Sequence, residues 1–413
     1  MTAATQRYLE LDALRGFAVI GILMMNIVAF SMPEMAYISP AIYGGTDLPD
    51  MMSWLMSYLF VDGKMRGLFT FLFGASLVLV CDRAAAKGEN PARTHFSRMF
   101  WLAVFGLIHF FFIWWGDILF LYAVIGSIAY FMRNLEAAKL IRWGLVLYAI
   151  GFIGYALFTG SLFFLQYAAA AAGPGSEAAL QYQDALDEIA PPAAALSAEV
   201  ALYLSGYVDL LSYNLTEKWF DPMVLVVANS LETLPFMMFG MALYKNGFLT
   251  GEWETKQYLQ LAKRTLSIGL ILLIPLGIWM IYSGFETILT LNAVLSWSMP
   301  SRLLMTVGYL AVLILVIQQF ASHPLLHRVA AAGRVAFSNY LGTSILMTLL
   351  FYGWGLGFYG SVGRAELYLI VSIVWGIMLL WSKPWLLRYR YGPLEWLWRS
   401  LARWELQSMK IAK

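Results

Sequence analysis

Long apolar segments recur along the chain and are separated by short polar segments. A helix needs roughly 20 mainly apolar residues to cross the hydrocarbon core of a bilayer, with a range of about 17–25. By this criterion the pattern predicts about ten spanning helices. They cover residues 14–32, 66–82, 98–115, 117–132, 142–165, 222–244, 266–284, 301–321, 334–354 and 366–382.

Two further segments are apolar or amphipathic but do not fit a span. Residues 51–61 ("MMSWLMSYLFV") are too short to cross, which predicts an interfacial or re-entrant helix. Residues 383–413 are rich in Trp and Arg, and we expect this amphipathic tail to lie along the inner headgroup layer.

One sizeable insertion, residues 166–221, lies between two predicted spans. It begins with an Ala/Gly/Pro-rich stretch ("AAAAAGPGSE"), which predicts a flexible linker, and it has helical character at 176–189 and 197–213. The insertion is acidic, with Lys218 as its single basic residue. We therefore expect a small helical cap on the extracytoplasmic side.

Composition agrees with the span pattern. Hydrophobic residues make up 61% of the 413 residues and charged residues only 13%, whereas soluble domains are about a quarter charged. Mean hydropathy is +0.68. The fold class predicted is an all-α polytopic membrane protein in one transmembrane domain, 1–413. The single cysteine, Cys81, excludes an intramolecular disulfide.

Basic residues are sorted between the two sides of the predicted membrane. With both termini in the cytoplasm, 22 of the 27 Lys and Arg residues fall on the cytoplasmic side, as the positive-inside rule requires. This sorting explains the basic residues without a nucleic-acid partner, and none is expected. The exceptions are Lys64, Arg66, Lys218, Arg302 and Arg364.

Polar residues form a stripe on the first span. Arg15 lies at its inner end, beside Asp12, and Asn26 follows eleven residues later, roughly 16 Å deeper and nearly above Arg15. Gly16 allows a second helix or a ligand to approach closely. Alternatively, Arg15 anchors the helix at the interface and Asn26 makes an interhelical hydrogen bond.

His109 is the only histidine within a predicted span, and Asp117 follows in a WWGD turn. A neutral imidazole can act as a general base on an alcohol or thiol. Asp117 would be about 12 Å away on a continuous helix. The Gly116 turn, however, breaks that helix. We therefore do not expect a direct His109–Asp117 pair along one helix, and we expect Asp117 to cap the next helix or face an outer vestibule. His109 as a hydrogen-bonded packing residue is the alternative.

Further ionisable residues lie within or beside spans, where such groups are costly and often functional. Glu232 shares its span with a proline that should kink the helix, so it lines either a polar path or a structural bend. Asp62 and Arg66, at the outer edge of the second span, are interfacial charges or contacts for an anionic headgroup or sugar. With one Cys and one intramembrane His, no metal site is expected.

Five motifs, in order from residue 7 to about 401, resemble the YeiB-like family of bacterial membrane proteins of unknown function. They are "RYLELDALRGFAVIGILMMNI", "DGKMRGLFTFLFGASL", "RMFWLAVFGLIHFFFIWWGDILFLYAVIG", "GRVAFSNYLGTSIL" and "YRYGPLEWLWRSL". The resemblance covers nearly the whole chain. It implies a multi-pass protein of the bacterial inner, or plasma, membrane.

The family looks like a branch of the transmembrane acyltransferase superfamily, whose members take an acyl group from cytoplasmic acyl-CoA to an acceptor across the membrane. The O-acylating branch has a histidine eleven positions after the first-helix arginine, where this chain has Asn26. This asparagine resembles the heparan-acetylating branch, where the histidine comes from elsewhere. His109 is the membrane-embedded candidate for that role in this chain.

The resemblance leads to a hypothesis of transmembrane acyl transfer with acyl-CoA as co-substrate. Catalytic roles fall to His109 and Asn26, and CoA binding to Arg15, Gly16 and Arg334. The acceptor, a glycan, a small molecule or a membrane lipid, would meet a vestibule. Its expected residues are Asp117, Asp62, Arg66 and Glu232. The sequence leaves open whether the chain is an enzyme, a permease for a small molecule or lipid, or a non-catalytic protein. It also allows a homodimer.

Overall fold

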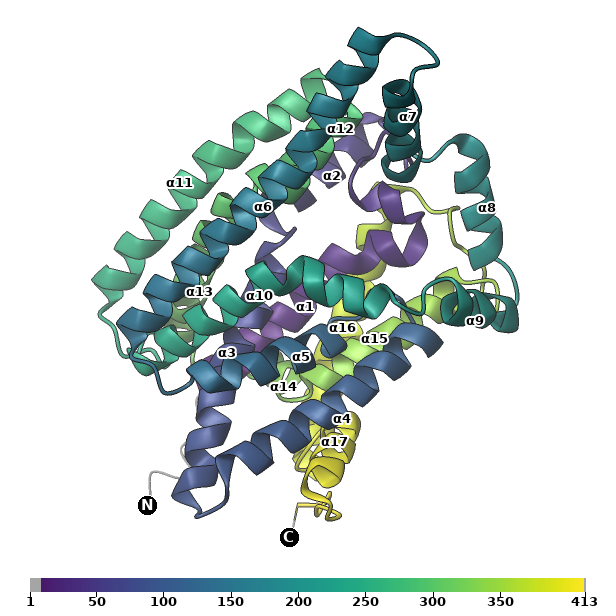
Figure 1. Ribbon diagram of the computed structural model, residues 1–413. Coiled ribbons are helices and arrows are strands. Elements are labelled where there is room, and N and C mark those ends of the chain that lie inside the picture. Colours follow the sequence, from purple (N-terminus) through teal and green to yellow (C-terminus); the bar gives the residue numbers. More distant parts are fainter. Residues whose placement is uncertain (1–8, 412–413) are drawn as a thin grey trace.

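The computed structural model describes residues 9–411, which fold into helices with no β-strand beyond one isolated bridge (Figure 1). The predicted all-α class is therefore confirmed. The α-helices are α1 (Leu9–Ser31), α2 (Leu48–Phe60), α3 (Lys64–Ala86), α4 (Pro91–Phe112), α5 (Leu119–Ala129), α6 (Ala137–Ala172), α7 (Glu177–Ile189), α8 (Ala193–Tyr203), α9 (Tyr207–Thr216), α10 (Asp221–Lys245), α11 (Thr255–Tyr282), α12 (Thr287–Asn292), α13 (Met299–Gln319), α14 (Pro324–Arg334), α15 (Ala336–Phe351), α16 (Arg364–Arg388) and α17 (Pro393–Arg403). The 3-10 helices η2 (Glu34–Tyr37) and η3 (Tyr130–Met132) and the π-helix η4 (Ala293–Trp297) complete the set.

Eight helical segments among the described residues are long and apolar enough to cross a bilayer, and they coincide with eight of the ten predicted spans. A ninth results if the bent pair α7–α8 and α9 is counted as one span. The predicted spans 117–132 and 334–354 correspond to shorter apolar helices, α5 with η3 and α15. These two helices are too short to cross a bilayer of ordinary thickness. They would need a locally thinner bilayer, or neighbouring helices to cover their ends.

The first span, α1, is the central helix of the bundle. It packs against α3, α13, α14, α15 and α16, and most of its residues are buried. Helices at the outside, such as α6 and α11, instead expose many large apolar side chains. An apolar outer surface is expected when the surrounding solvent is lipid, because apolar side chains then gain nothing from facing the protein interior.

Glycines permit the closest crossings in this bundle. A Cβ atom on Gly16 would lie 2.0 Å from the backbone oxygen of Val329 in α14, and one on Gly333 would lie 1.9 Å from that of Asp12. Small residues at such crossings let backbones touch and maximise van der Waals contact. The α1–α14 contact therefore depends on two glycines, one from each helix.

Gly16→Ala is expected to destabilise the protein by about 1–3 kcal/mol, because α14 must move away to accept the new methyl group. Gly376→Ala in α16 is the matched control, since its Cβ would meet nothing within 4 Å. This control should be neutral or stabilising by up to about 1 kcal/mol from helix propensity. Unfolding in detergent measures both, and equal stabilities would contradict the packing described.

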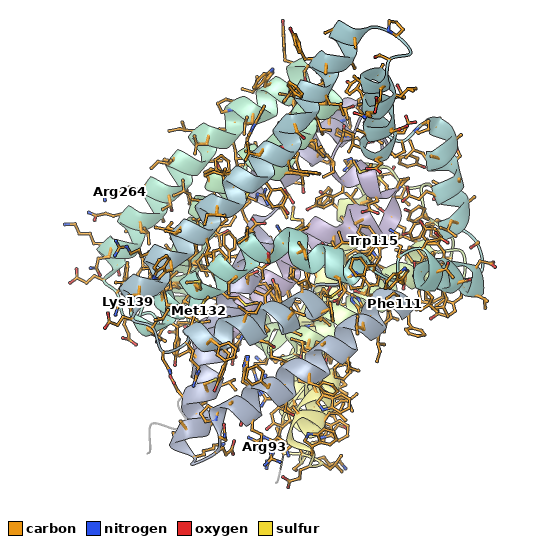
Figure 2. All side chains as sticks on the ribbon, in the orientation of Figure 1. Arg93, Phe111, Trp115, Met132, Lys139 and Arg264 are labelled. Atoms are coloured by element: carbon orange, nitrogen blue, oxygen red, sulfur yellow. The ribbon has the colours of Figure 1, made fainter. Side chains whose placement is uncertain are left out.

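Basic residues gather at one end of the bundle. Figure 2 labels Arg93, Lys139 and Arg264 along one side of the molecule, whereas Phe111 lies at the other end of Arg93's helix, α4. This is the end that the positive-inside rule would assign to the cytoplasm. The orientation in the membrane remains a prediction.

The insertion 166–221 has the helix expected at 176–189, but the one expected at 197–213 is divided into α8 and α9, and the first part of the insertion is not a linker. Helix α6 continues through the alanines to Ala172 and ends at Gly173, whose φ is +83°. Alanine is the best helix former, so this run extends the span instead of interrupting it. Helices α7–α9 follow. The Asn214 side chain in α9 donates to the Phe111 carbonyl at 3.2 Å, which ties the cap to the end of α4.

Candidate functional site

The α4–α5 hairpin brings His109 and Asp117 into direct contact. His109 Nδ1 lies 2.9 Å from Asp117 Oδ1, and both side chains are almost fully buried. Helix α4 ends at Phe112, so the chain doubles back over residues 113–118 instead of continuing the helix. The expectation that these residues do not pair was therefore wrong: the turn that breaks the helix also brings Asp117 back to His109.

The same carboxylate also fixes the start of α5. Asp117 Oδ2 accepts from the Phe120 backbone N–H at 2.8 Å, so the predicted capping role is present alongside the pair. Gly106 makes room for this arrangement, since a Cβ there would lie 2.3 Å from the Phe120 nitrogen. The hairpin thus holds Asp117 rigidly against the imidazole.

The hydrogen bond to Asp117 determines which ring nitrogen of His109 carries a proton. A carboxylate accepts, so Nδ1–H donates and Nε2 of the neutral ring keeps a lone pair. Nε2 is buried and has no hydrogen-bond partner in the described structure. Buried polar atoms are rarely left unsatisfied, and those that are call for an explanation such as a catalytic role.

Asn26 lines a small cavity between α1, α15 and α16. Its other lining residues are Val19, Ile22, Leu23, Phe30, Tyr340, Thr343, Ser344 and Met378. Asn26 is 8% exposed, and no residue in 9–411 is seen to hydrogen-bond its amide. The free space is only about 10 Å³, roughly that needed by one water molecule.

Two aromatic rings lie between Asn26 and His109. The Tyr340 ring lines the Asn26 cavity and its centroid is 5.2 Å from that of His109. The Trp114 ring stacks on Phe30 at 3.8 Å and meets His109 edge-on at 6.1 Å. The structure therefore brings the two predicted catalytic residues to one aromatic cluster.

Arg15 belongs to a cluster of arginines at the basic end of the bundle. Its guanidinium donates to Ser76 Oγ at 2.6 Å and to Asp12 at 3.3 Å. Arg98 on α4 stacks over the Trp398 ring at 4.1 Å. Arg399, Arg15 and Arg403 lie close enough to Arg98 to repel its charge. Several arginines from three separate elements therefore share one region, which suits a multiply charged anion.

The other two residues predicted to bind CoA lie on either side of the α1–α14 crossing or at its end. Gly16 faces the Val329 backbone, so the close approach that it allows is made by α14 and not by a ligand. Arg334 is the last residue of α14, directly before the break at Val335 that separates α14 from α15.

The tail helix α17 is fastened to that break by one carboxylate. Glu395 accepts from the Phe337 and Ser338 backbone N–H groups at 2.7 and 3.1 Å, and from Ser338 Oγ. It therefore caps α15, where the helix dipole favours an anion. Burial raises the pKa of Glu395, while the hydrogen bonds from Ser338 and Phe337 oppose this shift. The tail thus packs on the bundle as well as being amphipathic.

Asp62, Arg66 and Glu232 form a second, separate group, which Asp117 does not join. Arg66 donates to Glu232 Oε2 and, at 2.7 Å, to Asn229 Oδ1. Arg302 donates to both Glu232 oxygens at 3.1 and 3.2 Å. The predicted acceptor vestibule is therefore divided: Asp117 lies beside His109, and Arg66 pairs with Glu232. Asp62 acts on Arg66 but has Tyr37 as its hydrogen-bond partner.

Arg302 is held further by the π-helix η4. Its guanidinium donates to the carbonyls of Val294 and Leu295 at 3.2 and 2.6 Å, and its Nε donates to Ser298 Oγ at 3.1 Å. π-helical turns free backbone carbonyls and are frequent at functional sites. Gly63 lies against this side chain, since its Cβ would be 2.1 Å from Arg302 Cδ.

From the sequence no role was assigned to Arg302, although a signal was present. Five basic residues break the positive-inside rule. Three of them, Lys64, Arg302 and Arg364, are buried, and Arg66 is partly buried. The exceptions to that rule thus marked buried cations, of which Arg66 and Arg302 pair with Glu232.

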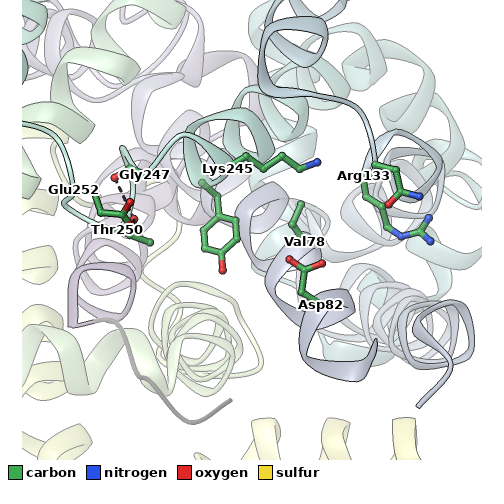
Figure 3. A pocket seen from close by; sticks show the side chains of 9 residues that line it. Val78, Asp82, Arg133, Lys245, Gly247, Thr250 and Glu252 are labelled. Atoms are coloured by element: carbon green, nitrogen blue, oxygen red, sulfur yellow. Dashed lines mark hydrogen bonds between the residues drawn. The ribbon is translucent and has the colours of Figure 1, made fainter. Parts of the chain in front are cut away.

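A polar cleft of about 380 Å³ opens at the basic end, between the ends of α3, η3 and α10 (Figure 3). Its charges are mixed: Asp82 and Glu252 lie with Arg133 and Lys245. Lys245 Nζ donates to the Leu135 carbonyl at 2.7 Å, so its charge already stabilises the loop beside it. No group of three or more potential metal ligands occurs within residues 9–411.

Long apolar helices around buried ion pairs define a multi-pass membrane protein. The model for "Protein of unknown function (DUF418)" matches residues 243–405. The uncharacterized protein YeiB of Escherichia coli (strain K12) is 30% identical over 410 residues, covering 96% of both chains. The uncharacterized protein YxaH of Bacillus subtilis (strain 168) is 30% identical over 409 residues, 97% of this chain and 95% of YxaH. No solved structure matches. The chain belongs to the YeiB family, as its motifs suggested.

Proposed function

We propose that this protein is a transmembrane acyltransferase of the bacterial inner membrane, with its basic end in the cytoplasm. It would move an acyl group, such as acetyl, from acyl-CoA to a hydroxyl or amine of a glycan or lipid. The observation that carries the proposal is the buried His109–Asp117 pair with an unpartnered Nε2. A base held in one tautomer by a carboxylate suits acyl transfer.

In the proposed reaction, His109 Nε2 takes the proton from the acceptor as its oxygen or nitrogen attacks the thioester carbonyl. Asp117 stabilises the imidazolium that forms. The Asn26 amide is a candidate donor to the oxyanion of the tetrahedral intermediate. That intermediate expels the CoA thiolate, which receives the proton from His109. The acyl–sulfur bond breaks and one acyl–oxygen or acyl–nitrogen bond forms.

The arginine cluster would hold the CoA phosphates. Arg15 and Arg98 come from the basic ends of α1 and α4, the two helices that carry Asn26 and His109. Arg399 and Arg403 come from α17, where Arg403 also pairs with Glu89 at 3.9 Å. Guanidinium groups bind phosphate bidentately and stay charged. Because the space at Asn26 is the size of a water molecule, the acyl arm could enter only after Tyr340 or Trp114 moves.

Acyl-CoA is expected to stabilise the purified full-length protein, by about 2.7 kcal/mol when its concentration is 100 times Kd. Arg98→Gln should weaken this binding about tenfold, since a charged hydrogen bond contributes about 1.5–3 kcal/mol. Arg93→Gln, exposed on the same helix, should bind as the parent does. Thermal unfolding in detergent against acetyl-CoA measures all three.

An absence of stabilisation by acetyl-CoA would contradict the proposed donor. It would instead favour transport, for which the Arg66–Glu232–Arg302 group gives specific support. Ionisable residues inside spans often mark substrate or ion pathways. A carrier of that kind has no reason to bind acyl-CoA, so one experiment separates the two functions.

A further inference from the structure

A second chamber lies on the opposite face of α1 from Asn26. Its walls include Met25 and Val28 of α1, whereas Ile22, Asn26 and Phe30 face the Asn26 cavity. Successive helical residues turn by about 100°, so these two sets lie on nearly opposite faces. The chamber is therefore distinct from the aromatic cluster at His109.

Polar groups converge on this chamber from several elements. Arg364 comes from the start of α16, Tyr37 from η2, Ser57 and Tyr58 from α2, and Asp62 from the turn before α3. The Tyr37 hydroxyl donates to Asp62. The Tyr58 hydroxyl donates to the Ala293 carbonyl at 3.2 Å. Trp54 and Val294 supply the apolar remainder of the wall.

Arg364 is the group that indicates a ligand. Its side chain is 2% exposed, and one guanidinium nitrogen donates to the Ala36 and Tyr43 carbonyls at 2.7 and 3.1 Å. Its Nε is buried and has no hydrogen-bond partner in the described part of the chain. A buried cation with an unsatisfied donor is costly unless an acceptor reaches it.

No carboxylate forms an ion pair with Arg364 in the part of the chain that the structure describes. Glu232 pairs with Arg66 and Arg302, and Asp62 accepts from the Tyr37 hydroxyl. Asp50 acts on Arg364 only from the partly exposed start of α2. Lys64 is 1% exposed and donates to the Tyr58 carbonyl at 2.5 Å, not to a carboxylate. The buried Arg364 guanidinium therefore lacks a direct anionic partner, in a medium where charge is poorly screened.

We propose that this chamber is an anion-binding site for a phosphate or carboxylate group, held by the Arg364 guanidinium. Free space inside is about 20 Å³, little more than one water molecule needs, so the bound group would have to displace a lining side chain. The body of a larger ligand would stay outside, at the end of the bundle that carries η2 and the α7–α9 cap. This proposal does not depend on acyl transfer, since an anionic acceptor or an anionic cargo would use the site equally.

The test uses full-length protein in an uncharged detergent. Thermal unfolding is followed against sodium phosphate and sodium acetate, each compared with sodium chloride at equal ionic strength. A second arm compares nanodiscs of phosphatidylglycerol with nanodiscs of phosphatidylcholine. Stabilisation by free phosphate or acetate identifies a soluble oxyanion, and stabilisation by phosphatidylglycerol alone identifies a lipid headgroup. Either result supports the site.

Variants assign the binding to the chamber. Arg364→Lys keeps the charge but loses the Nε donor, and should weaken binding about tenfold. Asp62→Asn removes the opposing carboxylate and should strengthen binding about tenfold, which keeps the test valid if Arg364→Lys fails to fold. Lys139→Gln is the control, because Lys139 is exposed at the basic end of the bundle, where it lies beside Glu136. Absence of stabilisation in both arms, or binding unchanged in Asp62→Asn, would overturn the proposal.

Discussion

Glu232→Gln is expected to destabilise the protein by about 3–5 kcal/mol, the cost of breaking a buried ion pair by removing one partner. The substitution preserves shape but leaves Arg66 and Arg302 without their shared carboxylate. Glu232 is 5% exposed and Arg302 6%, so water cannot replace the lost contact. Reversible unfolding of the purified protein measures the change in free energy.

The control for this prediction is Glu188→Gln, which removes an exposed carboxylate from α7 and should alter stability by less than about 0.5 kcal/mol. A double variant, Glu232→Leu with Arg302→Met, should cost less than the sum of the two single changes. If Glu232→Gln were as stable as its control, the buried network would not contribute to the fold.

His109→Ala is expected to lower the rate of acyl transfer by about 10²- to 10⁴-fold, the usual contribution of a general base. Affinity for acyl-CoA should stay unchanged, because the arginines lie at the other end of α4. Asp117→Asn should also slow transfer, since an amide can donate to Nδ1 and thereby favour the other tautomer. Release of the CoA thiol under saturating acyl-CoA measures the rate.

The matched control is His95→Gln, on the same helix. His95 is also buried, but its Nε2 is 3.0 Å from the Gly126 carbonyl and so has a partner. Glutamine can keep that contact, so transfer should remain close to the parent rate. Equal loss in His95→Gln and His109→Ala would indicate general damage to the bundle and argue against a base at His109.

Hydropathy alone predicted the helices well, because lipid imposes one rule on every span. Backbone groups must be satisfied within the helix, and about twenty apolar residues are needed. The α5 and α15 segments deviate because they are short and are supported by packing. The alanine run before Gly173 was assigned to a linker because composition was considered without the high helix propensity of alanine.

The candidate site could be predicted only in part. Four residues were selected from the sequence because they are polar and lie in apolar segments: His109, Asp117, Asn26 and Arg15. This criterion can be applied without knowing where the residues lie in space. Their pairing does need it: the His109–Asp117 contact depends on the chain reversing after Phe112. A linear distance along a helix could not anticipate this reversal.

Long-range partners are the second limit. Glu232 meets Arg66 and Arg302 from helices far apart in sequence, and no local spacing signals such a group. Gly16 is a further example. A glycine on a helix lets either a ligand or another backbone approach, and the sequence does not say which; here the backbone of α14 occupies that place. Only the exceptions to the charge sorting pointed to the buried cations.

Consumption of acyl-CoA by the purified parent protein and by His109→Ala tests the central claim most directly. Both are reconstituted in bacterial lipid and supplied with acetyl-CoA labelled in the acyl group. The account predicts that the parent releases CoA and passes label to a lipid or added glycan, and that His109→Ala retains acyl-CoA unreacted. Release of CoA at the same rate by both proteins, or by neither, would contradict it.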